Sequence, residues 1–163
     1  MDENDIKNVV SKIPSLEKAF RGTYAADEAL PISSKPAFYI VNTAVREQRG
    51  AHWLLVYYLG RDKTIFFDSF GTPLYTHSTI HTHVMNLGSE KILEQHQRLQ
   101  GFGSSVCGQY TIMTAYFINL GIPFISYLNK FSSNVTYNDS LACKFVENID
   151  ENILCQPFIN KYS

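Results

Sequence analysis

The chain has 163 residues, a length that fits one domain of the usual size of about 100–200 residues. Its 14 Lys and Arg balance 15 Asp and Glu to a net charge of −1, which argues against a strong nucleic-acid binder because such proteins carry a basic excess. A hydrophobic content of 45% fits a folded globule and excludes a disordered chain.

The first half of the chain predicts a helix, a loop and three strands. Apolar residues recur at helical spacing over residues 6–13, and Pro14 ends that pattern. Residues 22–36 are rich in Gly, Thr, Asp, Ser and Pro, which is typical of a loop. Segments rich in β-branched and aromatic residues, which we expect to be strands, begin at Ala37, Ala51 and Lys63. The second segment is apolar on both faces, which predicts a central strand covered on both sides.

The second half is predominantly helical in pattern. Residues 76–93 predict a helix, and the R-L-Q at 98–100 predicts a short strand. Residues 105–120 have helical apolar spacing that a Gly and a Pro bring to an end. Further helices are expected over 124–131 and 140–158. With strands in the middle and helices at both ends, residues 1–163 predict a single α+β domain in which helices flank one central mixed β-sheet.

The cysteine count and the first residues favour a reducing, intracellular compartment. Three cysteines without disulfide-like spacing (Cys107, Cys143 and Cys155) suit a reducing environment. The first residues lack the basic-then-apolar order of a signal peptide. No apolar run reaches the ~20 residues that a membrane helix needs. We therefore expect a soluble intracellular protein with no membrane partner.

The most informative motif is Q-G-F-G-S-S-V-C-G-Q-Y, in which a glycine-rich loop leads to Cys107 at the predicted start of a helix. Unpaired N–H groups and the positive end of the helix dipole favour a thiolate there and are placed to receive an oxyanion. This position is typical of a nucleophile. A buried, unreactive cysteine is the alternative, and we expect that role for Cys143 and Cys155, which lie in helical apolar patterns.

A cysteine nucleophile needs a base and a group that orients the base. His52 and Asp68 each interrupt an apolar strand, where a polar side chain without a partner is costly to bury. If the hairpin between the strands has a three-residue loop, Leu59 opposes Lys63 and Asp68 is diagonal to His52 on the same face. A four-residue loop would put the two side chains on opposite faces. The three-residue register is therefore a prediction.

The other histidines compete poorly for the role of base. His77, His81 and His83 form H-S-T-I-H-T-H, in which an i, i+4 pair on a helix is compatible with a metal, but no cysteine or carboxylate completes a site nearby. We expect a solvated polar face there and no metal. His96 lies in polar sequence and is expected to be exposed.

These residues resemble the adenovirus-type cysteine proteases (adenain), in the wider group that includes SUMO-specific proteases. The order His-Trp, then acidic-x-Phe-Gly, then Gln before Cys-Gly is the specific part of the resemblance. Its motifs are F-R-G-T-Y at Phe20, A-F-Y-I-V-N-T-A-V-R-E at Ala37, R-G-A-H-W at Arg49, F-F-D-S-F-G at Phe66 and Q-G-F-G-S-S-V-C-G at Gln100. The resemblance implies an adenain-like cysteine protease fold with the catalytic cysteine at a helix N-terminus.

The resemblance also implies roles for individual residues. Cys107 would be the nucleophile, His52 the base and Asp68 the group that orients it. Gln100, seven positions before the cysteine, would donate its side-chain amide to the oxyanion beside the Cys107 backbone N–H. Trp53 would either shield the imidazole–carboxylate contact from water or serve as a core aromatic.

The small residues Gly50 and Ala51 resemble an edge where an extended substrate pairs its backbone. With Trp53 they are the expected substrate-binding residues. No cofactor is required for the chemistry. The resemblance implies activation by a short viral peptide and by DNA, but the stretch before Gln100 lacks the cysteine expected for a disulfide to that peptide, and the net charge argues against strong DNA binding.

The resulting expectation is a cysteine endopeptidase that matures viral or virus-like precursor proteins at small-residue, Gly-containing sites, in the virion or the host nucleus. A deubiquitinase or deSUMOylase-type isopeptidase is the alternative, because it uses the same catalytic set. An acyltransferase would need an acetyl-coenzyme A site, and an inactive binding module would normally have lost part of the set. The sequence shows no sign of an acetyl-coenzyme A site, and no member of the catalytic set is missing.

Overall fold

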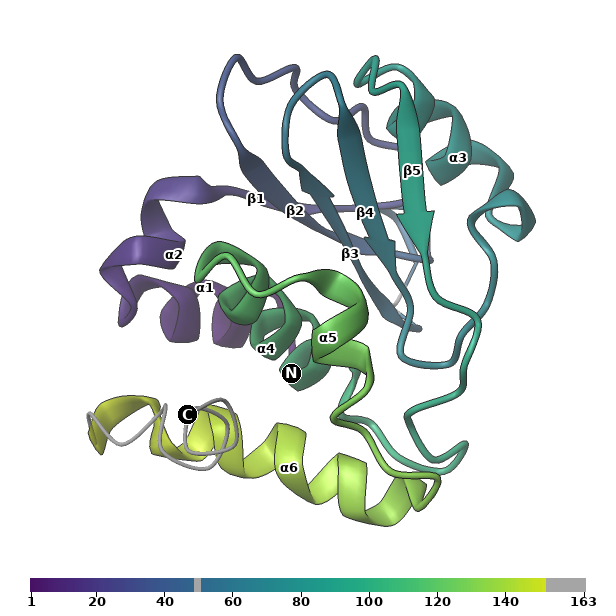
Figure 1. The fold of residues 1–163 in the computed structure, drawn as a ribbon. Helices are drawn as coiled ribbons and strands as arrows, with labels where there is room; N and C mark the ends of the chain where they lie inside the picture. Colours follow the sequence, from purple (N-terminus) through teal and green to yellow (C-terminus); the bar gives the residue numbers. More distant parts are fainter. Residues whose placement is uncertain (49–50, 152–163) are drawn as a thin grey trace.

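A five-stranded mixed sheet lies at the centre of the computed structural model, which describes residues 1–48 and 51–151 (Figure 1). Its strands lie side by side in chain order: β1 (Phe20–Tyr24), β2 (Ala37–Asn42), β3 (Trp53–Tyr58), β4 (Lys63–Phe67) and β5 (Lys91–Glu94). The three central strands are antiparallel, and each edge strand pairs in parallel with its neighbour. The predicted α+β class with a mixed sheet is confirmed.

The helices divide between the two faces of this sheet. They are α1 (Glu3–Ser11), α2 (Pro14–Ala19), α3 (Ser78–Met85), α4 (Cys107–Asn119), α5 (Phe124–Leu128) and α6 (Val135–Glu147), with 3₁₀ turns η1 (Leu74–Thr76) and η2 (Asn148–Glu151). Apolar residues of α1, α2, α4, α5 and α6 form one core with one face of the strands. The loop before β2, η1 and α3 form a second core with the other face. Figure 1 shows α1, α2, α4 and α5 below the sheet and α3 at its upper right, beside β5.

The central strand separates the two cores. Every residue of β3 is buried, and successive side chains alternate between the cores, so that Leu55 packs toward α4 and Leu54 toward α3. The prediction of a central strand covered on both faces is therefore confirmed. Burial on both sides explains why β3 is a continuous apolar run instead of an alternating one.

The hairpin between β3 and β4 has the predicted register. Tyr58 pairs with Thr64, and the Leu59 N–H donates to the Lys63 carbonyl at 3.1 Å, which closes a loop of three residues. This register places His52 and Asp68, each one residue beyond a strand end, on the same face of the sheet. The hairpin therefore has the three-residue loop that the predicted contact between His52 and Asp68 requires.

Several other predictions were wrong. β1 falls partly within the expected loop at 22–36. The N-terminal helix expected before Pro14 is confirmed as α1, and Pro14 begins a further helix, α2, which was not predicted. The expected helix over 76–93 is α3 alone, because residues 91–94 form β5 at the sheet edge. The expected strand at 98–100 is a loop. The helix expected over 140–158 begins earlier, as α6, and its predicted end lies outside the described residues.

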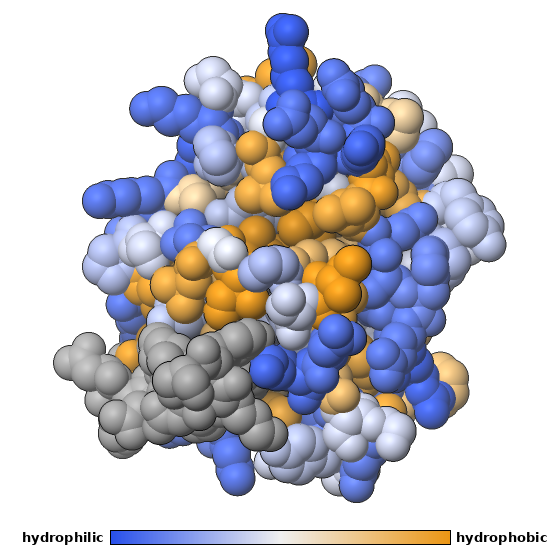
Figure 2. Space-filling view, viewed as in Figure 1, coloured by the Kyte–Doolittle hydropathy of each residue, from blue (hydrophilic) through white to orange (hydrophobic). Residues whose placement is uncertain are grey.

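Figure 2, drawn from the same side as Figure 1, shows a band of apolar surface across the middle of the molecule with polar side chains around it. Apolar side chains exposed in the structure include Leu93 of β5, Leu120 at the end of α4 and Ile125 of α5. Among the described residues, no helix is long and apolar enough to span a membrane.

Candidate active site

Cys107 is the first residue of α4, at the end of the glycine-containing loop. Its helix has no side-chain cap, so the N–H groups of the first turn have no intrahelical acceptor and are available to another group. The cysteine is buried but lies in the wall of a surface cleft. The backbone N–H groups of Trp53 and Gly108 donate toward its sulfur. These donors and the helix dipole favour a thiolate.

His52 and Asp68 are in direct contact. His52 Nε2 and Asp68 Oδ1 are 2.6 Å apart, and the Phe70 N–H donates to the same carboxylate oxygen at 2.8 Å. The His52 side chain is 12% exposed and the Asp68 side chain 1% exposed. Since Nε2 is taken by the carboxylate, Nδ1 is the nitrogen left for the hydrogen bond between His52 and Cys107.

These contacts change the acidity of all three groups. Burial disfavours the charged imidazole, but the hydrogen bonds to Asp68 and Cys107 outweigh it and raise the pKa of His52 from 6.5 to about 9. Burial likewise opposes ionisation of the thiol, but His52 and the backbone donors lower the pKa of Cys107 below its ordinary 9.0. For Asp68, the two neighbouring histidines outweigh burial and hold the carboxyl pKa well below its usual range. The arrangement therefore favours a thiolate–imidazolium pair beside an ionised carboxylate.

Gln100 lies in the same cleft, with its side-chain amide fixed at both ends. Ser69 Oγ donates to Gln100 Oε1 at 2.6 Å, and Gln100 Nε2 donates to the Ser104 carbonyl at 2.8 Å. The second bond sets which end of the amide is the nitrogen, because the Ser104 carbonyl can only accept a hydrogen bond. One N–H of the amide then remains for a group in the cleft, near the first turn of α4.

The loop that carries Gln100 is anchored from α4 and α6. Tyr110 Oη and Asn138 Nδ2 both donate to the Leu99 carbonyl, at 3.0 and 3.2 Å. The Gly101 N–H donates to Asp139 Oδ2 at 3.2 Å. The residues on both sides of Gln100 are therefore held by buried or half-buried partners, which preorganises its amide.

The turn after β4 joins the two parts of the site. Asp68 contacts the imidazole, while the next residue, Ser69, orients Gln100 and accepts the Leu99 and Gln100 N–H groups on its carbonyl at 2.9 and 3.0 Å. Gly71 adopts φ +73°, and a Cβ there would lie 2.7 Å from the backbone of the 96–97 segment. A glycine is thus required for this close approach.

The predicted environment of His77 was wrong. Its side chain is 18% exposed, and Nε2 lies 3.7 Å from Asp68 Oδ2, the carboxylate oxygen that His52 does not contact. His77 follows η1 at the start of α3, against the ring of Phe66. Sequence periodicity places the H-S-T-I-H-T-H histidines on one helix but does not show which of them packs against the sheet. No local signal identified His77 or Ser69.

The cleft around Cys107 has a volume of about 360 Å³, within the range of small ligand sites. His52, Gln100, Trp53 and Ala51 line it, whereas Gly50 lies outside the described residues. Trp53 is buried, and its Nε1 donates to the Met1 carbonyl at 3.0 Å. The structure brings together the predicted nucleophile, base, orienting acid and oxyanion donor. The substrate-binding role of the small residues stays a prediction.

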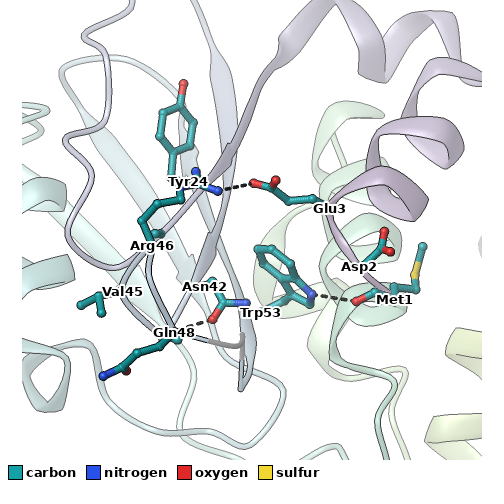
Figure 3. Close-up of a pocket in the computed structure, with 11 residues that line it drawn as sticks. Met1, Asp2, Glu3, Tyr24, Asn42, Val45, Arg46, Gln48 and Trp53 are labelled. Carbon is teal, nitrogen blue, oxygen red and sulfur yellow. Dashed lines mark hydrogen bonds and ion pairs between the residues drawn. The ribbon is translucent and has the colours of Figure 1, made fainter.

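A second pocket of about 270 Å³ adjoins this cleft and shares Trp53 and Asn42 with it. Figure 3 shows the N-terminal residues on one side of this pocket and the β2–β3 connection on the other. Arg46 Nη1 and Glu3 Oε1 form an ion pair across it at 3.1 Å. The Cys107 cleft and this pocket therefore lie side by side, with Met1 as a third residue that lines both.

Comparison with solved structures identifies a shared fold. No family model matches the chain, and no curated protein matches it. The crystal structure of the ASFV pS273R protease matches with a TM-score of 0.52 over 85% of this chain, at 10% identity. This chain shares that protease's fold. It spans 65% of the length of that protein.

The remaining predicted residues lie apart from the cleft. His96 is exposed as predicted, 4.0 Å from Glu94. Cys143 is a free, half-buried cysteine of α6, and burial raises the pKa of its thiol. Cys155 lies outside the described residues. Within the described residues, no group of three or more His, Cys, Asp or Glu side chains is arranged to hold a metal ion.

Proposed function

We propose that this chain is a cysteine peptidase with Cys107 as nucleophile. The observation that carries the proposal is the continuous line of contacts from the Cys107 thiol through His52 to Asp68, with Gln100 in the same cleft. A structural cysteine needs none of these partners. The fold shared with a solved protease supports the same function.

Acylation follows from these positions. The Cys107 thiolate attacks the substrate carbonyl carbon, and the carbonyl electron pair moves to oxygen. That oxyanion accepts from the backbone N–H of Cys107 and from the free N–H of Gln100 Nε2. The tetrahedral intermediate collapses as the carbon–nitrogen bond breaks, and the His52 imidazolium gives its proton to the leaving amine. The product is a thioester between Cys107 and the acyl half.

Deacylation uses the same groups in the opposite sense. His52, now neutral, takes a proton from water, and the resulting oxygen attacks the thioester carbon. The oxyanion forms again at the same donors, the carbon–sulfur bond breaks, and the carboxylic acid half leaves. Cys107 returns as thiolate beside the imidazolium. Asp68 remains ionised throughout and keeps the imidazole in position.

The family resemblance of the sequence extends this proposal to the substrate class. It favours cleavage of viral or virus-like precursor proteins, as in capsid maturation, with a Gly on the acyl side of the scissile bond. A peptide activator and DNA are further proposals from the resemblance; the net charge of −1 weighs against DNA.

The test is peptide cleavage by three proteins: the full chain, Cys107→Ala and Cys143→Ala. A library of Gly-containing peptides serves as substrate, with and without added DNA. We expect cleavage by the full chain and by Cys143→Ala, and none by Cys107→Ala, with the three melting temperatures within a few degrees. Cleavage by Cys107→Ala would contradict the proposal. Labelling of Cys107 by a ubiquitin-like vinyl sulfone probe would favour the isopeptidase instead.

A further inference from the structure

An exposed aromatic side chain stands at one end of the Cys107 cleft. Phe102 is 80% exposed, although it lies between two glycines in a loop that is otherwise anchored. Its ring lines the same cleft as Cys107. A large apolar side chain that is left in water inside a cleft is a common mark of a binding surface.

Phe102 belongs to a row of rings that begins at His52. The rings of His52 and Phe70 are 4.6 Å apart between centroids, and Phe70 stacks on Phe102 at 6.1 Å with an interplanar angle of 26°. The guanidinium of Arg98 lies 4.0 Å above the Phe102 ring. Phe102 is thus held by stacking and by a cation–π contact, while most of its surface stays open.

The turn that presents Phe102 is closed by hydrogen bonds. The Ser104 N–H and hydroxyl both donate to the Gly101 carbonyl at 3.1 Å, and the Ser104 carbonyl accepts from Gln100 Nε2. The aromatic ring therefore has a fixed place relative to the amide proposed to bind the oxyanion. A fixed apolar wall at a fixed distance from the reacting carbonyl is suited to select one substrate side chain.

The two ends of the cleft differ, which assigns the two halves of a substrate. One end is bounded by Met1 and Trp53, which also line the pocket of Figure 3, and the other end is bounded by Phe70 and Phe102. The imidazole of His52 must reach the leaving nitrogen to protonate it. Because Phe70 packs on that imidazole at 4.6 Å between centroids, this contact favours the aromatic end for the leaving group and the Trp53 end for the acyl half.

We propose that Phe70 and Phe102 form a subsite for the first residue after the scissile bond, and that this subsite takes a large apolar side chain. This inference rests on the proposed peptidase function and narrows its substrate class. A glycine at that position would leave the open face of Phe102 in water, whereas Leu or Phe would cover it. Apolar pockets discriminate by about 10–200-fold per methylene group, and a one-sided wall such as this one is expected to give about tenfold.

The test uses quenched-fluorescence peptides that share one Gly-ended acyl half and differ in the next residue, which is Gly, Leu, Phe or Asp. For the full chain we expect kcat/KM to be about tenfold higher with Leu or Phe than with Gly. In Phe102→Ala this ratio should fall to about one, and in Phe102→Leu it should be intermediate. Tyr75→Ala is the matched control, since Tyr75 is a 72% exposed aromatic outside the cleft. Its ratio should equal that of the full chain.

Two results separate this inference from the function on which it rests. Cleavage with a ratio near one in the full chain, or with an unchanged ratio in Phe102→Ala, would overturn the subsite and leave the peptidase proposal standing. Absence of cleavage of every peptide by the full chain, with Cys107 unreactive toward iodoacetamide, would overturn both.

Discussion

Replacement of Asp68 by Asn tests whether the carboxylate controls the protonation of His52. Asn has nearly the same volume and still accepts from the Phe70 N–H, so the turn after β4 should keep its shape. The change removes the negative charge 2.6 Å from His52 Nε2, in a site where both side chains are mostly buried. The perturbation is therefore mainly electrostatic.

The size of the effect follows from the pKa of His52. A pKa of about 9 in place of 6.5 means that the folded site favours the imidazolium by roughly 3 kcal/mol. Asp68 is the strongest of the groups that raise this pKa, and Cys107 supplies the rest. Loss of the carboxylate should therefore weaken the thiolate–imidazolium pair by roughly 2 kcal/mol, which corresponds to a fall in kcat/KM of about 30-fold.

The assay is the rate at which iodoacetamide alkylates Cys107, followed from pH 4 to 10 by mass spectrometry of the peptide that contains it. In the full chain the rate should persist well below pH 9, because the thiol pKa is lowered. In Asp68→Asn the alkylation rate should fall at a higher pH than in the full chain, because the thiolate–imidazolium pair is weaker. Asp62→Asn, in the exposed β3–β4 loop, is the control. A profile of Asp68→Asn that matches the control would refute the electrostatic role.

Three further predictions concern the same site. The pH profile of kcat/KM should be bell-shaped, with an alkaline limb near pH 9 where His52 loses its proton and an acid limb below the ordinary thiol pKa; a profile that still rises above pH 9 would contradict the raised pKa. Gln100→Ala should lower kcat by about 10²–10³-fold, and adding Ser69→Ala to it should cause no further loss, whereas additive losses in this double-mutant cycle would show that the serine acts elsewhere. His77→Gln should raise the pKa of the Asp68 carboxyl, which His77 faces. A lowered carboxyl pKa stabilises the fold above the unfolded value of about 3.9, and this stabilisation is lost as the pH falls through the folded value. Acid unfolding of this variant, followed by circular dichroism, should therefore occur at higher pH, and an unchanged midpoint would contradict the contact.

The sequence was most informative where local rules decide the structure. The β3–β4 hairpin is such a case, because the length of a short loop fixes the register and the register fixes which side chains share a face. The contact between His52 and Asp68 was therefore predicted on the condition of a three-residue loop, which the structure has. The start of α4 at Cys107 was equally accessible, since a glycine-containing loop precedes a long apolar helical pattern.

The sequence was least informative where distant segments pair. β5 is a four-residue edge strand whose partner, β4, lies more than 20 residues earlier, so nothing local separates it from the end of a helix. β1 likewise owes its strand conformation to parallel pairing with β2 across an intervening loop. The position of His77 behind Asp68 depends on how α3 packs against the sheet, which periodicity alone does not fix.

The turn after β4 explains why a short motif carries so much of the site. Asp68 sets the charge and orientation of the imidazole, Ser69 sets the orientation of the Gln100 amide, and Phe70 packs on the imidazole ring and leads to Phe102. Consecutive side chains at a strand end point in different directions, so three neighbours in sequence reach the base, the oxyanion donor and the proposed leaving-group subsite. Displacement of this one turn would misplace all three at once. The close approach of the 96–97 backbone to Gly71 holds the turn against such a displacement.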